Sequence, residues 1–216
     1  GSHTADVLSE NGYIVSILDK VSSPWLRSDQ AMIVGDMMDP DILDSSMQDV
    51  DCVYDFAGIA DIGEAKSNPY NTIEINIMGL TKALEAAVKN NVKQFIFASS
   101  GSVYGIKKEM EVTEDLSLVP ISTYNETKMI AERVIKSYEN EIIFHSIRPA
   151  TVCGFSPRMR LDVSVNMFAF QALKSKSISV FGGNQIRPNI HIQDLINVYK
   201  HFISNPNLPS GFYNAG

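Results

Sequence analysis

The sequence predicts an α/β protein built on a parallel sheet. Helical and strand patterns alternate along the whole 216-residue chain, the strand patterns are short apolar runs, and no internal repeat or low-complexity tract interrupts them. The 44% hydrophobic and 20% charged residues suit a globular protein with a sizeable core. No apolar run is long enough to span a bilayer, and no segment resembles a signal peptide.

Charge and cysteine content narrow the class of function. The net charge is -7 and no basic cluster occurs, which argues against nucleic-acid binding. Cys52 and Cys153 suit a reducing compartment better than a disulfide scaffold. Histidines and cysteines are scattered without ligand spacing, so we predict no metal site. We therefore expect a cytoplasmic protein that handles small molecules, without a nucleic-acid or membrane partner.

The first half of the chain alternates three helical patterns with four strand patterns. An amphipathic stretch over 2–10 predicts a helix that stops at Asn11-Gly12. Asp39-Pro40 is typical of a helix start, with an aspartate N-cap and proline at the first helical position. One long helix is expected over 69–89. The expected strands are 13–18, 31–34, 52–56 and 94–98.

In the second half, a polar loop over 105–122 leads to a helix over 123–138. Thr123 and Glu126 at its start have the spacing of a capping box. Asp194 opens the last helix, and for this residue we favour an N-cap over a ligand role. We expect His191 to make a structural hydrogen bond. The remaining elements are strand 142–147, helix 161–174 and strand 178–181.

The start of the chain resembles part of a dinucleotide-binding unit. Such folds hold the pyrophosphate at a glycine-rich turn before the first helix and present a carboxylate to the ribose after the second strand. In this sequence the first helix begins directly after Gly1, and Asp19 ends the strand that follows the helix. We therefore expect the first strand of the fold to lie before Gly1. Gly1 would then be the last glycine of the glycine-rich turn. Asp19 is otherwise a turn residue; as a ribose ligand it favours NAD over NADP. The predicted fold class is a Rossmann-like doubly wound parallel sheet.

Two further strands end in segments that suit a cofactor cleft. Gly35-Asp36 and Phe56-Ala57-Gly58 come just after strands, on the side where ligands of such sheets bind. Asp36 taken alone is more often a turn former. Together with Asp19, these segments favour a cofactor site along this edge of the sheet.

Tyr124 and Lys128 form the strongest short motif, Tyr-x-x-x-Lys, within an expected helix. Residues four apart share a helix face, so the phenol and the ammonium point into the same space. A nearby cation favours the phenolate and lowers a pKa that starts near ~10. We predict that Tyr124 exchanges a hydroxyl proton while hydride moves to or from a nicotinamide, although chance matches to so short a motif are frequent.

Serines follow the buried strand 94–98, as Ser99, Ser100 and Ser102 before Val103-Tyr104-Gly105. Active sites of this architecture lie at the carboxyl ends of parallel strands. One hydroxyl there is suited to hydrogen-bond a substrate oxygen and to stabilise charge on it. For any single serine, an ordinary polar turn is the preferred interpretation.

Taken together, these motifs resemble the extended short-chain dehydrogenase/reductases of the NAD-dependent epimerase/dehydratase family, with UDP-glucose 4-epimerase and other nucleotide-sugar enzymes most similar. The likeness covers nearly the whole chain, and its segments are Gly1-Ser2-His3, Asp19, Gly35-Asp36, Phe56-Ala57-Gly58, Asn76, Ser99-Ser100, Val103-Tyr104-Gly105 and Tyr124 with Lys128. Because Gly1-Ser2-His3 matches the family, the alternative that it is a tag scar is disfavoured.

The resemblance implies roles for individual residues. Ser100, Tyr124 and Lys128 match the catalytic residues, with Tyr124 as the acid/base and Lys128 as its partner. The cofactor would be NAD, with Asp19 at the adenosine ribose and Asn76 behind the cleft. The implied cofactor-binding residues are Gly1, Asp19, Asp36, Met37, Phe56, Ala57, Gly58, Asn76, Ser99, Tyr124 and Lys128.

The resemblance divides the chain at Arg148. Residues 1–148 would form the NAD-binding domain with the catalytic residues, and 149–216 a small substrate-binding region interleaved with the last sheet elements. Gly182-Gly183 and Arg187-Pro188 resemble the segment that delivers an arginine to the nucleotide diphosphate, a task that suits its planar fork. The expected substrate-binding residues are Ser100, Gly101, Ser102, Thr151, Asn166 and Arg187.

Family reactions of this kind begin by oxidising the sugar at C4. A 4,6-dehydratase carries an acid and a carboxylate directly after its catalytic threonine, where this chain has Gly101 and Ser102. The resemblance therefore implies an NAD-dependent nucleotide-sugar epimerase acting by hydride transfer at C4. The alternatives are a nucleotide-sugar 4-dehydrogenase or 4-ketoreductase, and a non-catalytic NAD(P)-sensing regulator. The family further implies a homodimer and a role in polysaccharide biosynthesis.

Overall fold

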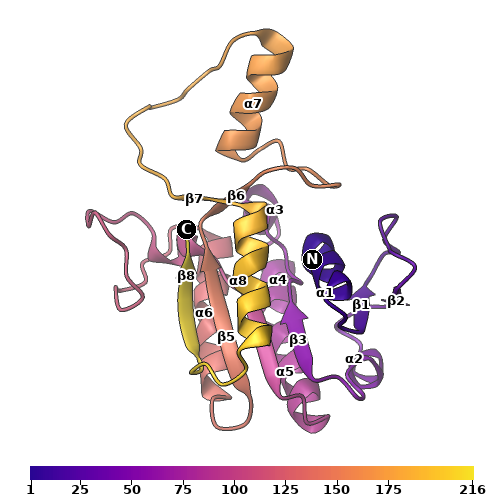
Figure 1. Ribbon diagram of the computed structural model, residues 1–216. Helices are drawn as coiled ribbons and strands as arrows, with labels where there is room; N and C mark the ends of the chain where they lie inside the picture. The colour runs from indigo at the N-terminus through magenta and orange to yellow at the C-terminus, as the bar shows by residue number, and fades with distance from the viewer.

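The computed structural model describes residues 1–216 and has a layered α/β architecture (Figure 1). The central sheet is parallel throughout and has the strand order β3-β4-β5-β8. Its strands are β3 (Cys52–Asp55), β4 (Gln94–Ala98), β5 (Ile143–Pro149) and β8 (Gly211–Ala215). The predicted parallel α/β fold is confirmed.

Two smaller parallel pairs accompany the central sheet. The first joins β1 (Val15–Asp19) to β2 (Gln30–Val34), and the second joins β6 (Thr151–Cys153) to β7 (Asn189–His191). In this chain β1 pairs only with β2, and β3 pairs only with β4, so no strand joins the two sheets.

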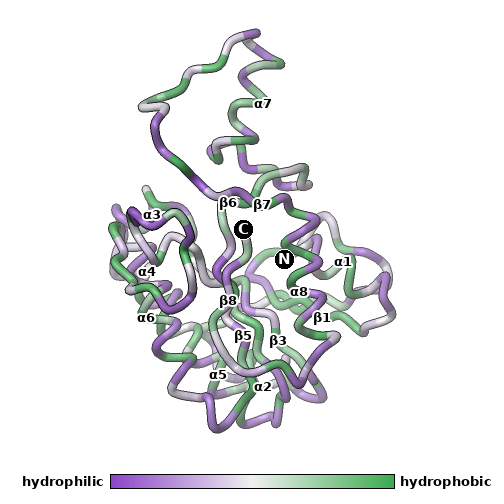
Figure 2. Tube along the Cα trace, turned by 60° about the vertical axis from the view of Figure 1, so that its left-hand side comes forward, coloured by the Kyte–Doolittle hydropathy of each residue, from purple (hydrophilic) through white to green (hydrophobic).

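Helices cover both faces of the central sheet, as the doubly wound class requires. In Figure 1, α8 (Ile192–Ser204) crosses the front, while α5 (Leu80–Lys89) and α6 (Thr123–Ser137) lie behind. Figure 2 shows the hydrophobic strands between these layers. Phe97 packs on the α5/α6 side and Ile96 on the α8 side, and both are fully buried. Successive side chains of β4 point to opposite faces of the sheet, so β4 contributes to two separate cores.

The remaining helices lie at the edges and at the top. They are α1 (Ser2–Glu10), α2 (Pro40–Ser46), α3 (Ile62–Ser67), α4 (Pro69–Ile73) and α7 (Ser164–Ser175). The predicted α2 start is confirmed, because the Asp39 carboxylate accepts from the amides of Asp41 and Ile42. None of the helices combines the length and the apolar run that crossing a bilayer requires.

The helix expected over 69–89 is continuous but not uniform. Between α4 and α5 it widens into the π-helical segment η1 (Glu74–Gly79), which carries Asn76. Single π turns inside helices occur frequently at functional sites. Periodicity alone does not reveal such a widening.

Three sequence expectations are wrong in detail. The N-cap of α6 is Ser122 rather than Thr123, because the Ser122 hydroxyl is the group that accepts from the Asn125 amide. The N-cap of α8 is His191 rather than Asp194, since the His191 ring accepts from the Gln193 amide. The strand expected over 178–181 does not form: its apolar side chains are exposed and it has no partner strand to complete a hydrogen-bond ladder.

Candidate active site

The carboxyl ends of β3, β4 and β5 meet at one edge of the central sheet. The loop around Gly58 follows β3, and Ser99 and Ser100 follow β4, where the 3₁₀-helix η2 (Gly101–Tyr104) begins. The first turns of α6 bring Tyr124 and Lys128 to the same edge. Residues from three separate segments thus converge, as the sequence predicted from the position of each motif.

Ser100 lies near enough to Tyr124 for its hydroxyl to act on the pKa of the phenol. Burial raises the pKa of the Tyr124 phenol, while the Ser100 hydroxyl and the charge of Arg160 act in the opposite direction. The sequence had attributed a lowered Tyr124 pKa to Lys128. In the structure burial outweighs every charge near the phenol, and the Lys128 ammonium is bound elsewhere.

Lys128 is buried, and its Nζ donates to the carbonyl oxygen of Ala98 at 2.8 Å. The same Nζ lies 4.5 Å from the centroid of the Phe97 ring. Burial lowers the pKa of Lys128 to about 8, and the carboxylates of Asp55 and Glu132 act against burial. Because the pKa of Lys128 lies this close to neutral pH, its protonation state responds strongly to any change in the charges around it.

Asn76 ties the β3 loop to α6. Its Oδ1 accepts from the Ile59 amide at 2.7 Å, and its Nδ2 donates to the Ile59 carbonyl and to the Thr127 hydroxyl, both at 3.0 Å. Gly58 has a φ of 144°, and a Cβ on it would lie 2.9 Å from Asn76 Oδ1. Glycine is therefore required where this loop crosses the site.

A buried ion pair lies next to Ser99. Arg148 donates through Nε and Nη2 to the two oxygens of Glu132, at 2.8 and 2.7 Å. Ser99 donates to Glu132 at 2.6 Å, and Arg148 Nη1 donates to the Tyr104 hydroxyl at 2.6 Å. The network fixes β4, β5 and α6 relative to one another. Sequence reasoning missed this pair, although Glu132 lies one helical turn after Lys128 and shares its face.

The expected adenosine end of the cleft is more exposed. Asp19 ends β1, and its carboxylate accepts from the Val21 amide at 3.1 Å. Asp36 accepts from Lys20 at 2.8 Å and from the Met38 amide at 2.9 Å. The Lys20 ammonium holds the pKa of Asp36 below its usual range.

The predicted substrate residues are not all brought together. Gly101 and Ser102 adjoin Ser100, and the Ser102 hydroxyl lies 2.7 Å from the Ser100 hydroxyl. Thr151 begins β6 near the same edge, whereas Arg187 is exposed in the loop before β7. Asn166 is buried in α7, where its side chain accepts from the Gly154 amide and donates to the Arg160 carbonyl, both at 3.0 Å.

Arg160 is a site residue that sequence reasoning missed. Its guanidinium pairs with Asp162, and its charge also acts on the Tyr124 phenol. No spacing rule links positions 124 and 160, so only the fold reveals the proximity. No group of three or more histidine, cysteine, aspartate or glutamate side chains is arranged to hold a metal ion.

The residues at this edge fit a dinucleotide. Gly1 lies at the N-terminus of α1 and against Phe56, since a Cβ on Gly1 would lie 3.7 Å from that ring. Met37 packs against Gly79 of η1, next to the Asp36 carboxylate. A helix N-terminus, an exposed carboxylate at the end of β1 and a glycine in the loop after β3 match the needs of phosphate, ribose and nicotinamide groups.

Comparison with known proteins agrees with this geometry. The model of the NAD dependent epimerase/dehydratase family matches residues 1–216. The chain is 27% identical over 226 residues to UDP-glucose 4-epimerase of Bacillus subtilis, covering 90% of this chain and 67% of that protein. The chain thus spans about two thirds of the length of this relative.

The chain is also similar to solved structures of nucleotide-sugar 4-epimerases. The UDP-N-acetylglucosamine 4-epimerase of Methanobrevibacter ruminantium M1, in complex with UDP-N-acetylmuramic acid, has a TM-score of 0.89 and 26% identity, covering 100% of this chain and 72% of that one. The UDP-glucuronic acid 4-epimerase of Bacillus cereus, in complex with UDP-glucuronic acid and NAD, has a TM-score of 0.87 and 29% identity, covering 100% and 74%.

Proposed function

The chain belongs to the NAD-dependent epimerase/dehydratase family, and from this premise we propose that the protein is a nucleotide-sugar 4-epimerase. The observation that carries the proposal is the convergence of Ser100, Tyr124 and Lys128 at the carboxyl edge of the sheet. We assign NAD binding and catalysis to residues 1–148, and sugar-nucleotide binding to residues 149–216.

In the proposed mechanism, the Tyr124 phenolate takes the proton of the sugar C4 hydroxyl and later returns it to the C4 oxygen. The Ser100 hydroxyl donates a hydrogen bond to that oxygen and stabilises the charge that develops on it. When bound, NAD would supply the hydride acceptor and donor. Lys128, whose Nζ is held at the Ala98 carbonyl, would hold the nicotinamide ribose and add positive charge to the cofactor side of the site. Return of hydrogen to the opposite face of C4 inverts that centre.

Two features support epimerisation over loss of water. A Cβ on Gly101 would lie 3.1 Å from the Pro149 carbonyl oxygen, so the backbone of β5 leaves little room for an acidic side chain there. Ser102 is neutral, and its hydroxyl donates to Asn125 at 2.8 Å. An elimination across C5 and C6 needs an acid and a base beside the sugar. Neither residue after Ser100 supplies one.

We propose UDP-sugars as substrates, because the similar enzymes act on UDP-glucose, UDP-N-acetylglucosamine and UDP-glucuronic acid by name. Asn166 and Arg187 would face the diphosphate, with Thr151 nearer the sugar. The two cysteines are free thiols, which supports a cytoplasmic enzyme. Its product would be an activated sugar of the kind that polysaccharide synthesis consumes.

A second copy of the chain is the proposed partner. Ile73 of α4, Ile121 just before α6 and Ile130 of α6 line one shallow groove and are exposed, and Tyr70 of α4 and Met78 of η1 are exposed as well. Exposed apolar side chains on neighbouring helices are typical of a protein interface. Light scattering on the full-length protein tests this: a dimer is expected, and a monomer at micromolar concentration contradicts it.

The test of the function is incubation of the full-length protein with NAD and each of the three UDP-sugars, followed by chromatography and mass spectrometry. A product of unchanged mass without accumulating NADH is expected. Loss of two hydrogens with NADH formation indicates a dehydrogenase, and loss of water contradicts the argument from Gly101. Bound NAD without turnover of any sugar indicates a sensor.

Tyr124→Phe is the matched variant. It removes one hydroxyl and leaves the ring in place, so NAD binding persists while turnover falls by about 10²–10⁴-fold. Calorimetry with NAD and the same product assay measure the two effects. Full turnover in this variant excludes Tyr124 as the acid/base.

A further inference from the structure

Lys128 is a buried cation whose charge must be balanced within the fold. The two groups that contact its Nζ are the Ala98 carbonyl oxygen, at 2.8 Å, and the Phe97 ring, whose centroid lies 4.5 Å away. Neither carries a negative charge. An ammonium that is buried without a counter-charge loses its proton at lower pH, because desolvation disfavours the charged form.

The charged groups around Lys128 come from three elements: Asp55 from β3, Glu132 from α6 and Arg148 from β5. The charge of Glu132 is already balanced by Arg148, because both Glu132 oxygens accept hydrogen bonds from Arg148. One of these oxygens also accepts from Ser99. Asn76 of η1, which contacts the Gly58 loop next to Lys128, is neutral. One carboxylate therefore remains to balance Lys128.

Asp55 occupies the right place for this role. It is the last residue of β3 and pairs with Phe97, the residue whose ring Lys128 covers. Only 7% of Asp55 is exposed, and its carboxylate has one hydrogen-bond donor, the Ala57 amide at 2.9 Å. The loop that follows lies against the ammonium, since a Cβ on Gly58 would be 3.8 Å from Lys128 Nζ.

We infer that Asp55 is a positioning residue that keeps Lys128 charged and thereby sets the upper pH limit at which the Tyr124–Lys128 pair operates. The inference deepens the proposed function and rests on it for the role of that pair. The electrostatics agree: the Asp55 carboxylate acts against the burial that lowers the pKa of Lys128 to about 8. Reciprocally, the Lys128 charge opposes the burial that raises the pKa of Asp55. The two groups titrate as a coupled pair.

The expected direction follows from the sign of the charge. Asp55→Asn removes the negative charge but keeps an oxygen to accept from the Ala57 amide. Without the Asp55 charge, less opposes the effect of burial on Lys128. The pKa of Lys128 therefore falls further, and the side chain becomes neutral at lower pH. An opposite charge at this range changes a pKa by about 1–3 units, so the midpoint falls by about one pH unit or more.

The decisive experiment is a ¹³C-lysine NMR titration of the full-length protein without sugar. The Lys128 signal is assigned by its loss in Lys128→Arg. A midpoint near 8 is expected in the wild type and a lower one in Asp55→Asn. Asp51→Asn is the control, because Asp51 precedes the same strand but is exposed and paired with Lys93. An unchanged Lys128 midpoint in Asp55→Asn overturns the inference.

The pH profile of kcat/KM separates this inference from the proposed function. If both hold, the alkaline limb moves to lower pH in Asp55→Asn and stays in place in Asp51→Asn. If the Lys128 midpoint moves but no sugar is turned over, Asp55 is still the counter-charge of Lys128 and the proposed function fails. An alkaline limb that stays in place overturns the role in catalysis. Should Asp55→Asn not fold, the smaller Asp55→Ser takes the same measurements.

Discussion

The residues beneath the active site and the segment 155–188 are held in very different ways. Below the site, Asn76, Glu132 and Arg148 are buried, and each is bound by partners from other elements. In segment 155–188, Asn166 is the one buried residue. Figure 1 shows α7 standing away from the sheet, and Figure 2 shows hydrophobic stretches along this projecting segment.

Under the proposed function, the firmly held residues carry out the chemistry and segment 155–188 recognises the substrate. The proposed catalytic groups are fixed by contacts within residues 1–150, so their geometry is set before a ligand arrives. Segment 155–188 makes few contacts with the rest of the chain, and many of its apolar side chains are exposed. Substitutions in this segment are expected to change which sugar is bound at little cost to the fold.

The largest expected effect lies in the buried ion pair. Arg148→Met leaves the Glu132 carboxylate buried without its partner, and the free energy of unfolding is expected to fall by about 3–5 kcal/mol. Denaturant titration measures this loss. The double variant Arg148→Met with Glu132→Leu removes both charges and is expected to recover most of the stability.

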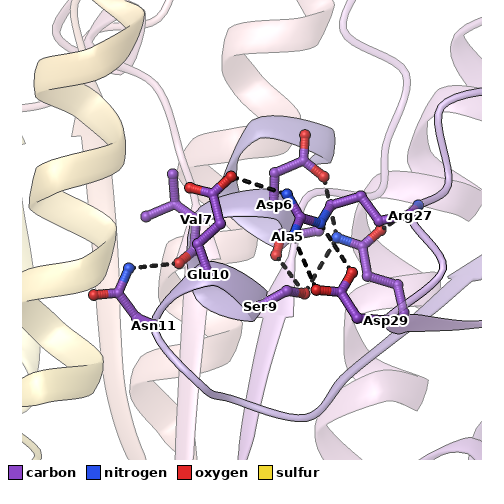
Figure 3. Close-up of polar contacts among 9 residues, drawn as sticks. Ala5, Asp6, Val7, Ser9, Glu10, Asn11, Arg27 and Asp29 are labelled. Carbon is purple, nitrogen blue, oxygen red and sulfur yellow. Dashed lines mark hydrogen bonds and ion pairs between the residues drawn. The ribbon is translucent and has the colours of Figure 1, made fainter.

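The control for this prediction is an arginine of the exposed surface. Arg27 pairs with Glu10 and Asp29 beside the end of α1 (Figure 3). Ion pairs open to water contribute little, because solvent screens them. Arg27→Met is therefore expected to leave the melting temperature nearly unchanged. Equal losses at positions 27 and 148 would contradict the assignment of stability to the buried pair.

A smaller effect of opposite sign is expected within the same well-partnered region. Ser146 lies on β5 between Phe97 and Phe212, and its hydroxyl is buried without a hydrogen-bond partner. Ser146→Ala removes this unsatisfied group and is expected to stabilise the fold by about 1 kcal/mol. Ser99→Ala makes the same chemical change where the hydroxyl donates to Glu132, and it is expected to destabilise. Thermal melts with the same sign for both variants would show that hydrogen bonding does not decide the outcome.

The sequence was informative where a local pattern determines structure. Apolar runs and stop signals located α1 and β4 to the residue, and Asp39-Pro40 located α2. Motif spacing brought Ser100, Tyr124 and Lys128 to one edge of the sheet. The pattern failed where a structural element depends on a partner far away in the sequence. The apolar run 178–181 was expected to be a strand, but it has no other strand to pair with. Likewise, Glu132 and Arg148 are 16 residues apart on different elements, and no periodicity connects them.

The smallest expected effect is the loss of stability on truncating an exposed side chain in segment 155–188. Leu84 in α5 is fully buried, whereas Leu173 in α7 is 75% exposed. Leu84→Ala is expected to cost about 2–5 kcal/mol, because it removes packed methyl groups and leaves a cavity. The same change at Leu173 is expected to cost less than about 0.5 kcal/mol, since water already surrounds the side chain. Denaturant titration of the two variants measures the contrast. A large loss at Leu173 would mean that α7 is covered in the folded protein, and segment 155–188 would then be as firmly held as the proposed catalytic residues.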